Sequence, residues 1–322
     1  MHSEKSSAKN DITSLWDASW KHTMKKHRLG NTDMEVSVLG FGGSEIGYQR
    51  ISLSAAKKLL NKALEAGVNV IDTAECYITS EDLIGEALGK RRKDYYLFTK
   101  CGHERGWSQP DWSAPSLLRS IERSLKRLKT DHLDLVQLHS CSLAELRKGE
   151  VIEALKRARE RGYARFIGYS GDSQAARYAV ESGAFDTLQT SISIADQEAI
   201  DLVLPLASQK NIGVIAKRPL ANLAWHNGNL PPSDSYGRVY WERLQKLKCD
   251  FLQTDLKEAV AIALRFTLTV SGVHTAIVGT AKSGRFAENA AIAAVGPLPK
   301  NLFDTIRARW REVARPSWIG QT

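Results

Sequence analysis

Residues 133–170 read LDLVQLHSCSLAELRKGEVIEALKRARERGYARFIGYS, and this stretch decides the fold class. An apolar run from Leu133 is followed by an amphipathic segment from Val151 to Arg161, and a second apolar run begins at Arg165. A strand that is buried on both faces reads as a nearly continuous apolar run, and two parallel strands need a long crossover between them. The stretch therefore predicts a strand, a helix and a second, parallel strand.

The same order of apolar run and helical segment repeats along most of the chain. Other amphipathic segments run from Ser54 to Ala66, from Ser116 to Leu128 and from Glu258 to Thr269. Eight such units predict a (β/α)8 TIM barrel, built as a single α/β domain. The eight apolar runs are VSVLGF from Val36, NVIDT from Asn69, YYLFT from Tyr95, LDLVQL from Leu133, RFIGYS from Arg165, FDTLQT from Phe185, IGVIA from Ile212 and HTAIVG from His274.

Three segments lie outside this repeat. Residues 24–35, MKKHRLGNTDME, predict an N-terminal hairpin that turns at Gly30-Asn31 and closes the barrel floor. A long loop from Lys217 to Asp255 follows the seventh strand, contains a candidate helix from Tyr236 to Leu247, and is expected to shape the site. We interpret residues 1–23 as an N-terminal extension whose order the sequence does not fix, and residues 24–322 as the barrel domain.

Composition is typical of a chain with a large core, since 43% of the 322 residues are hydrophobic and 25% are charged. No apolar run reaches the roughly 18 residues of a membrane span, and the first residues lack the apolar core of a secretion signal. We therefore expect a cytoplasmic protein. The four cysteines are scattered without a CxxC pair, which favours reduced thiols over disulfides and predicts no metal site.

The formal charge of +9 raises the alternative of a nucleic-acid partner. The densest basic runs are residues 90–93 and the stretch from Lys156 to Arg161. Both lie where a helix is expected to end, a position that favours cations. We interpret them as solvated surface and expect no nucleic-acid partner.

Four polar residues follow three successive predicted strands. Asp72 and Tyr77 follow the second strand in VIDTAECY, Lys100 ends the third in LFTK, and His139 ends the fourth in LVQLH. Alone, each has an ordinary structural explanation, such as a helix cap, a surface charge, an interior imidazole or a packing ring. Because catalytic groups of a TIM barrel lie at the carboxyl ends of its strands, the four together favour a catalytic site.

With these residues in this order, the sequence resembles the aldo-keto reductase family from about Lys25 to Asn289. The resemblance implies an NAD(P)H-dependent oxidoreductase that reduces aldehydes or ketones to alcohols, or runs in reverse. Hydride transfer turns a carbonyl oxygen into an alkoxide, which needs a proton donor and a hydrogen-bond donor.

Each of the four residues has a role in that family. Tyr77 is then the general acid, and Lys100 lowers the pKa of its phenol. Asp72 holds Lys100 by an ion pair. His139 orients and polarises the carbonyl, and assists proton transfer.

The resemblance also implies a set of cofactor residues. Ser170 and Gln189 hold the carboxamide, and Lys282 and Arg285 contact phosphate. NADPH is the expected cofactor, with NADH open because Gly279 replaces a lysine that is common in the family. The other cofactor positions are Gly42, Gly43, Thr280, Glu288 and Asn289.

Two positions depart from the family pattern. Ser170 is followed by Gly171 and Asp172, where the family usually has an asparagine directly after the serine. Lys217 stands where an aromatic residue commonly stacks on the nicotinamide. We therefore assign Lys217 or Arg218 a different task, such as contacting the pyrophosphate.

Two other classes of function stay open. One is a nucleotide-binding regulatory or sensor subunit of the same fold, and the other is a barrel lyase or isomerase acting on a sugar phosphate. Neither a Walker motif nor a GxGxxG fingerprint is present. A small carbonyl compound or alcohol is the expected partner, while its identity and the oligomeric state are not readable. Candidate substrate-lining residues are Ile46, Tyr48, Trp107, Trp225 and Trp318.

Overall fold

The computed structural model describes residues 24–321 except 105, 229 and 234. The predicted extension, residues 1–23, lies outside the described residues. Eight strands close into a barrel in the order β10-β3-β4-β5-β6-β7-β8-β9, and every neighbouring pair is parallel. The predicted (β/α)8 barrel is therefore confirmed. Its strands are β3 (Leu39–Gly42), β4 (Val70–Asp72), β5 (Tyr96–Cys101), β6 (Leu133–His139), β7 (Ala164–Ser170), β8 (Thr187–Ser191), β9 (Gly213–Lys217) and β10 (Thr275–Gly279).

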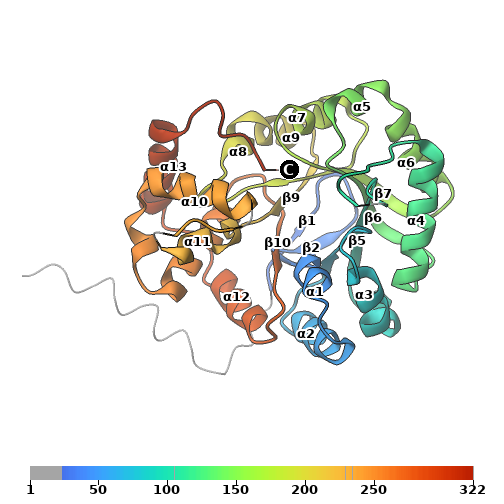
Figure 1. Cartoon of the computed structure of the whole chain (residues 1–322), viewed down its shortest axis with the longest axis horizontal. Helices are drawn as coiled ribbons and strands as arrows, with labels where there is room; N and C mark the ends of the chain where they lie inside the picture. The colour runs from blue at the N-terminus through green and yellow to red at the C-terminus, as the bar shows by residue number, and fades with distance from the viewer. Residues whose placement is uncertain (1–23, 105, 229, 234, 322) are drawn as a thin grey trace, which may run out of the picture.

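Helices surround the strands on the outside of the barrel (Figure 1). Within residues 24–321, the described elements also include three short 3-10 helices: η2 (Gly89–Asp94), η3 (Ala221–Asn227) and η4 (Asp250–Gln253). The α-helices are α1 (Ser44–Tyr48), α2 (Leu53–Glu65), α3 (Ser80–Leu88), α4 (Ala114–Leu128), α5 (Leu143–Lys148), α6 (Glu150–Glu160), α7 (Ser173–Ser182), α8 (Glu198–Leu202), α9 (Leu204–Gln209), α10 (Ser235–Leu247), α11 (Leu256–Thr269), α12 (Arg285–Ala294) and α13 (Lys300–Val313).

Helix α4 illustrates why these segments are helical. It begins after Ser113 with a proline in its first turn, where the missing N–H costs nothing. Leu117, Ile121 and Leu128 recur at helical spacing and are buried against the barrel. It ends where Lys129 takes a left-handed conformation with φ of 53°.

Successive side chains of each strand point alternately outward and inward, and this divides the apolar core into two clusters. Side chains such as Ile71, Leu97 and Val136 face outward and join the layer between strands and helices. Their neighbours face into the barrel and form a separate cluster, which we call the floor. The floor consists of Leu29, Met34, Val36, Val70, Phe98, Leu135, Ile215 and Ile277.

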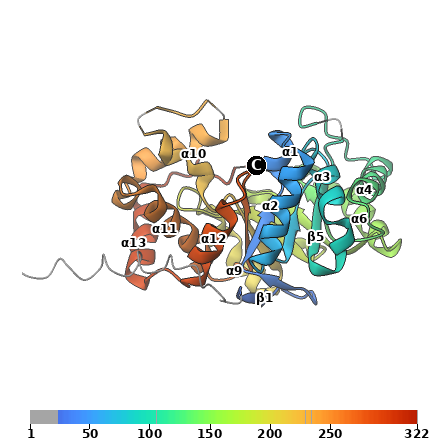
Figure 2. The same ribbon diagram turned by 90° about the horizontal axis from the view of Figure 1, so that it is seen from below.

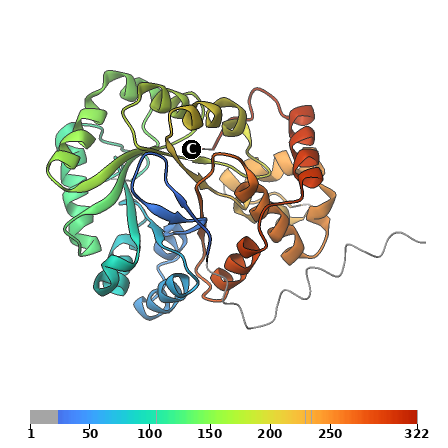
Figure 3. The same ribbon diagram turned by 180° about the vertical axis from the view of Figure 1, so that it is seen from behind.

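The predicted N-terminal hairpin supplies part of the floor. Strand β1 (Lys26–Arg28) pairs antiparallel with β2 (Glu35–Ser37), and Figure 3 shows this hairpin lying across one end of the barrel. The turn contains Gly30 but spans the six residues between the strands rather than two. The predicted single run from Val36 was wrong in one respect, because it divides between β2 and β3. The division lets the hairpin side chains point into the barrel.

The opposite end of the barrel, which we call the mouth, carries the carboxyl ends of the eight strands. Figure 2 shows β1 at one end of the molecule, with α10 and the last described residues at the other. The long connection after β9 contains η3 and α10, which confirms the predicted helix there. No helix in the described part of the chain has the length and apolar character needed to cross a membrane.

Candidate active site

The mouth is lined by polar side chains that share a face with the floor. Because every second residue of a strand faces the same way, Val70 in the floor is followed by Asp72 in the mouth. Phe98 and Lys100 repeat this arrangement on β5. The same step on β6 leads from Leu135 to Gln137 and His139, on β8 from Thr187 to Gln189, and on β9 from Ile215 to Lys217.

Asp72 is the centre of a buried hydrogen-bond network. The Lys100 ammonium donates to Asp72 Oδ1 at 2.5 Å and to the carbonyl oxygen of Thr73 at 2.9 Å. Asp72 Oδ2 accepts from Gln189 Nε2 at 2.8 Å and from Gln137 Nε2 at 3.4 Å. Asp72 and Lys100 are almost completely buried, so their charges are compensated chiefly by each other.

Tyr77 lies directly above this ion pair. Lys100 Nζ is 5.2 Å from the centre of the Tyr77 ring. Burial raises the pKa of the Tyr77 phenol well above its ordinary value, and the Asp72 carboxylate raises it further. The expected lowering of this pKa is not found, because burial and the Asp72 carboxylate outweigh any effect of the Lys100 charge. Tyr77 therefore keeps its proton at neutral pH.

His139 completes the predicted group of four. Its ring packs edge-on against Tyr77, with 5.7 Å between the centres, and against Trp107 at 4.6 Å. Its Nδ1 is 3.5 Å from the Cys76 sulfur. Burial, followed by the Lys100 charge, lowers the pKa of His139 well below its ordinary value. The imidazole is neutral at physiological pH.

The loop after β5 covers one side of this group. The buried Glu75 carboxylate accepts from the backbone N–H groups of Gly102 at 2.7 Å and His103 at 2.8 Å. Arg123 of α4 donates to the same carboxylate at 2.8 Å. Glu75 thereby holds the start of the loop that presents Trp107. Neither Glu75 nor Gln137 was predicted as a site residue, although Gln137 lies two residues before His139 on the inward face of β6.

The candidate substrate-lining residues divide into two groups. Trp107 Nε1 donates to the Tyr48 hydroxyl at 3.3 Å, and the Tyr48 ring lies 5.6 Å from that of Tyr77. These two aromatic side chains are exposed at the mouth. The others pack into the core rather than lining an opening, because their side chains turn toward the outer apolar layer: Ile46, Trp225 and Trp318.

On the other side of the mouth, Lys217, which departs from the family pattern, forms an ion pair with Asp172, the residue after the departing Gly171. Lys217 Nζ at the end of β9 lies 2.8 Å from Asp172 Oδ2, just after β7. Burial alone would raise the pKa of the Asp172 carboxyl, but the Lys217 ammonium holds it below its ordinary value. Burial lowers the pKa of Lys217 to about 8, although Asp172 opposes this shift.

Comparison with known proteins gives the same family as the resemblance found in the sequence. A model described as "Aldo/keto reductase family" matches residues 38–311. The chain belongs to the aldo/keto reductase family. An L-galactose dehydrogenase of Arabidopsis thaliana is 30% identical over 280 residues, which cover 82% of this chain and 86% of the relative. The holo form of the aldo-keto reductase AKR11C1 from Bacillus halodurans superposes with a TM-score of 0.78 at 28% identity, covering 89% and 96% of the two chains.

A third relative has a different printed function. A probable voltage-gated potassium channel subunit beta of Arabidopsis thaliana is 26% identical over 312 residues, covering 85% of this chain and 93% of the relative. The family and its oxidoreductase members nevertheless support an oxidoreductase enzyme that acts on carbonyl compounds.

The family's carboxamide positions lie next to the hydrogen-bond network of Asp72. Ser170 Oγ is 3.3 Å from Gln189 Oε1, and Gln189 in turn donates to Asp72. Gly43 packs tightly, since a Cβ there would lie 2.6 Å from Ser80 Oγ. Gly42 is also buried, at the end of β3.

The family's phosphate and adenine positions gather at the end of β10 and the start of α12. Arg285 and Glu288 form an ion pair at 2.8 Å that is well exposed, so its partners can be exchanged for a ligand. Gly279 is exposed, and the Lys282 N–H is held by Thr280 Oγ1 at 3.1 Å. The donor set of exposed cations and helix N–H groups fits the phosphates of a dinucleotide. Asn289 is buried on the inner side of α12.

Arg218 follows Lys217 at the mouth. Its Nη1 donates to Ser191 Oγ at 3.0 Å and to the carbonyl oxygen of Gln321. The last described residues therefore return to the mouth beside the ion pair. A Cβ on Gly320 would lie 2.5 Å from Asp172 Cβ, so this segment also covers Asp172.

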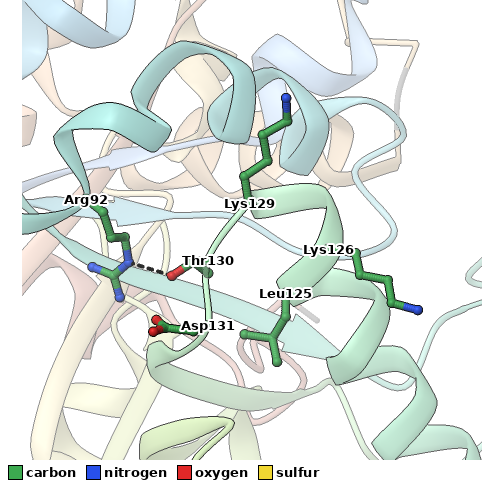
Figure 4. A pocket seen from close by; sticks show the side chains of 6 residues that line it. All are labelled: Arg92, Leu125, Lys126, Lys129, Thr130 and Asp131. Atoms are coloured by element: carbon green, nitrogen blue, oxygen red, sulfur yellow. Dashed lines mark hydrogen bonds between the residues drawn. The ribbon is translucent and has the colours of Figure 1, made fainter.

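A hollow of about 610 Å3 lies on the outer surface beside α4 and contains none of the predicted site residues (Figure 4). Two of the basic side chains that line it, Arg92 and Lys129, already have partners. Arg92 donates to Thr130 at 3.1 Å and to Asp134 at 2.8 Å, and Lys129 pairs with Glu86. The basic run at residues 90–93 thus includes an arginine with a structural role.

Proposed function

We propose that this chain is an NADPH-dependent aldo-keto reductase that reduces a small aldehyde or ketone to an alcohol and can run in reverse. The observation that carries the proposal is the buried Asp72–Lys100 pair beside Tyr77 and His139 at the barrel mouth. An isolated buried ion pair adds little stability, so its place among two further polar groups favours a chemical role. The cytoplasmic location stays a prediction.

Tyr77 is the proposed general acid. The reduced nicotinamide supplies the hydride when it is bound. Negative charge then grows on the carbonyl oxygen, and a protonated phenol within hydrogen-bond reach can neutralise it. The raised pKa of Tyr77 keeps that proton available at neutral pH. Lys100 stabilises the phenolate that Tyr77 leaves behind, and Asp72 fixes the ammonium in place.

His139 is proposed to orient the carbonyl rather than to supply a proton. Its pKa is lowered, first by burial and then by Lys100, so the ring is neutral and can donate one N–H. A fixed donor aimed at the carbonyl oxygen stabilises the charge that develops there. Trp107 packs against the ring and limits its motion.

The dinucleotide is proposed to lie across the mouth from β7 toward α12. Ser170 and Gln189 are suited to the carboxamide because they carry hydroxyl and amide groups beside the reacting centre. Lys282 and Arg285 are suited to a 2′-phosphate, which favours NADPH over NADH. Backbone and side-chain groups of Gly42, Gly43, Gly279, Thr280, Glu288 and Asn289 are assigned to the rest of the cofactor.

Steady-state oxidation of NADPH with 4-nitrobenzaldehyde tests this function, with NADH measured in parallel. We expect sustained turnover that depends on both cofactor and aldehyde. A chain that binds neither cofactor would contradict the proposal and favour a barrel lyase or isomerase.

A nucleotide-binding regulatory subunit is the second candidate, because one relative is named as a potassium channel subunit. Such a subunit would bind NADPH but turn over very slowly. Fluorescence titration with NADPH, combined with the rate of a single turnover, separates the two functions. Rapid oxidation of bound NADPH by an aldehyde would exclude a purely sensory role.

A further inference from the structure

The Asp172–Lys217 ion pair is a buried charged pair at the mouth that the proposed mechanism does not use. The two side chains are 1% and 10% exposed, and 2.8 Å separates their charged atoms. Asp172 Oδ1 also accepts from Thr190 Oγ1 at 2.8 Å and from the Ser191 N–H at 2.7 Å. Its position is therefore fixed from β8 as well as from β9.

Packing does not account for this pair. Replacing a buried ion pair by apolar residues of similar volume is often neutral or stabilising, so two buried charges are a poor way to fill space. The chain departs from the family pattern at Lys217 and at Gly171, the residue directly before Asp172. The contact between Asp172 and Lys217 therefore joins the two segments in which the chain departs from that pattern.

The pair is close to the proposed reacting centre. The Lys217 charge contributes, after burial, Lys100 and His103, to lowering the pKa of His139. Gln189, between the strands that carry the pair, donates directly to Asp72. A nicotinamide ring that transfers hydride to a carbonyl held by Tyr77 and His139 must lie at the mouth. It would then lie near the Asp172–Lys217 pair.

The two redox forms of a nicotinamide differ in charge in a way that such a pair can distinguish. The oxidised ring carries one positive charge, and the reduced ring carries none. In a buried site a fixed ammonium disfavours the oxidised ring, and a fixed carboxylate favours it. With both present the two effects oppose each other.

We propose that Asp172 and Lys217 set the relative affinity of the site for oxidised and reduced nicotinamide, and thereby the favoured direction of the reaction. This inference rests on the proposed function. Lys217 is a specificity-determining residue for the redox state of the cofactor, and the negative charge of Asp172 partly offsets the effect of its positive charge.

Equilibrium titration with NADP+ and NADPH, without substrate, tests the pair in four full-length variants. Lys217→Gln should lower the ratio of the NADP+ to the NADPH dissociation constant by about tenfold, because Asp172 then acts unopposed. Asp172→Asn should raise the ratio by about tenfold. Lys217→Arg keeps the charge and should stay within about threefold of the wild-type ratio. The double variant Asp172→Asn/Lys217→Gln should return to within about threefold.

A matched control removes a half-buried cation at the opposite end of the barrel. Arg92 pairs with Asp134 at 2.8 Å, near the amino end of β6, so Arg92→Met should leave the ratio unchanged within about twofold. If Lys217→Gln does not fold, Lys217→Met makes the same change of charge.

Opposite shifts in the two single variants, cancelled in the double variant, would support the inference. Shifts in the same direction, or an unchanged ratio in folded variants, would overturn it while leaving the proposed function intact. A wild-type chain that binds neither cofactor would overturn the proposed function itself.

Discussion

At the residue scale, Tyr77 differs from phenylalanine only by the hydroxyl that donates the proton in the proposed reaction. We predict that Tyr77→Phe lowers kcat by about 10²–10⁴-fold and leaves the NADPH dissociation constant nearly unchanged. Stopped-flow measurement of hydride transfer and a fluorescence titration check both values. Tyr163→Phe removes a hydroxyl that donates to Glu122 outside the mouth, and it is the matched control. A Tyr77→Phe variant that keeps more than a third of the hydride-transfer rate would contradict the assignment.

Arg285 tests the choice between NADPH and NADH. Its guanidinium pairs with Glu288 at the exposed start of α12 and can exchange this partner for a 2′-phosphate. A charge-assisted hydrogen bond contributes about 1.5–3 kcal/mol, so Arg285→Ala should weaken NADPH binding by about ten- to a hundredfold. Binding of NADH should hardly change. Equal losses for both cofactors, or a wild-type preference for NADH, would contradict the assignment of NADPH.

At the scale of elements, one feature of the sequence made both the strands and the residues at their mouth ends predictable. A buried parallel strand is apolar throughout, and its polar inward residue at the carboxyl end interrupts that run, as Asp72, Lys100 and His139 do. Contacts between distant strands leave no such local mark. The bonds from Gln137 to Asp72 and from Lys217 to Asp172 therefore appeared only in the structure.

The same limit applies to pKa values. The sequence predicts that a lysine near Tyr77 lowers the pKa of the phenol, because opposite charge favours the phenolate. It does not reveal that the surroundings desolvate the phenol, nor that the Asp72 carboxylate lies close enough to raise its pKa. Desolvation and Asp72 together reverse the expected direction.

The segment that follows α13 is held at the mouth by a carboxyl group with a perturbed pKa. Asp196 Oδ2 accepts from the Gln321 N–H and from the Tyr240 hydroxyl, both at 3.2 Å. Burial, followed by the Asp172 charge, raises the pKa of Asp196 to about 7, although Arg243 opposes the shift. Because the folded-state pKa exceeds the unfolded value, the neutral acid stabilises the fold at low pH. This contribution is lost as pH rises from about 4 through 7.

Asp196→Asn keeps a neutral hydrogen-bonding side chain at every pH. We predict that, between pH 5 and pH 8, the variant gains stability relative to wild type, by at most about 4 kcal/mol. Urea denaturation at several pH values measures this difference. Asp201→Asn, at a side chain that is 56% exposed, is the control and should follow the wild-type profile. A constant difference between Asp196→Asn and wild type would show that Asp196 does not titrate in this range.

At the scale of the whole molecule, the residues that close and stabilise the barrel lie at one end of its axis, and the residues proposed to carry out the reaction lie at the other end. The floor is apolar and closed by the hairpin, and the mouth carries the ion pairs and the aromatic loop. The hairpin could be predicted from its turn residues, but its fit against the amino end of β9 could not. That fit depends on Gly30, whose backbone lies against Asn211 and Gly213.

Gly30 therefore allows the two ends of the barrel to be tested separately. Its φ is +55°, and a Cβ would lie 2.2 Å from the Gly213 nitrogen and 2.6 Å from the Asn211 oxygen. Both neighbours are backbone atoms at or just before the start of β9, so they cannot move without disturbing this strand. Gly30→Ala should lower the free energy of unfolding by about 2–5 kcal/mol, through backbone strain and overpacking together.

Gly183→Ala separates these two contributions. Gly183 has a similar φ of +66° with open space around it, so this control should lose only about 1 kcal/mol. Urea denaturation measures the loss in free energy of unfolding for both variants. NADPH titration at low temperature should show unchanged affinity in both folded variants, because the mouth lies at the far end of the barrel from Gly30. A Gly30→Ala variant no less stable than Gly183→Ala would mean that the hairpin can move away from β9. In that case the floor would not depend on a close fit at Gly30.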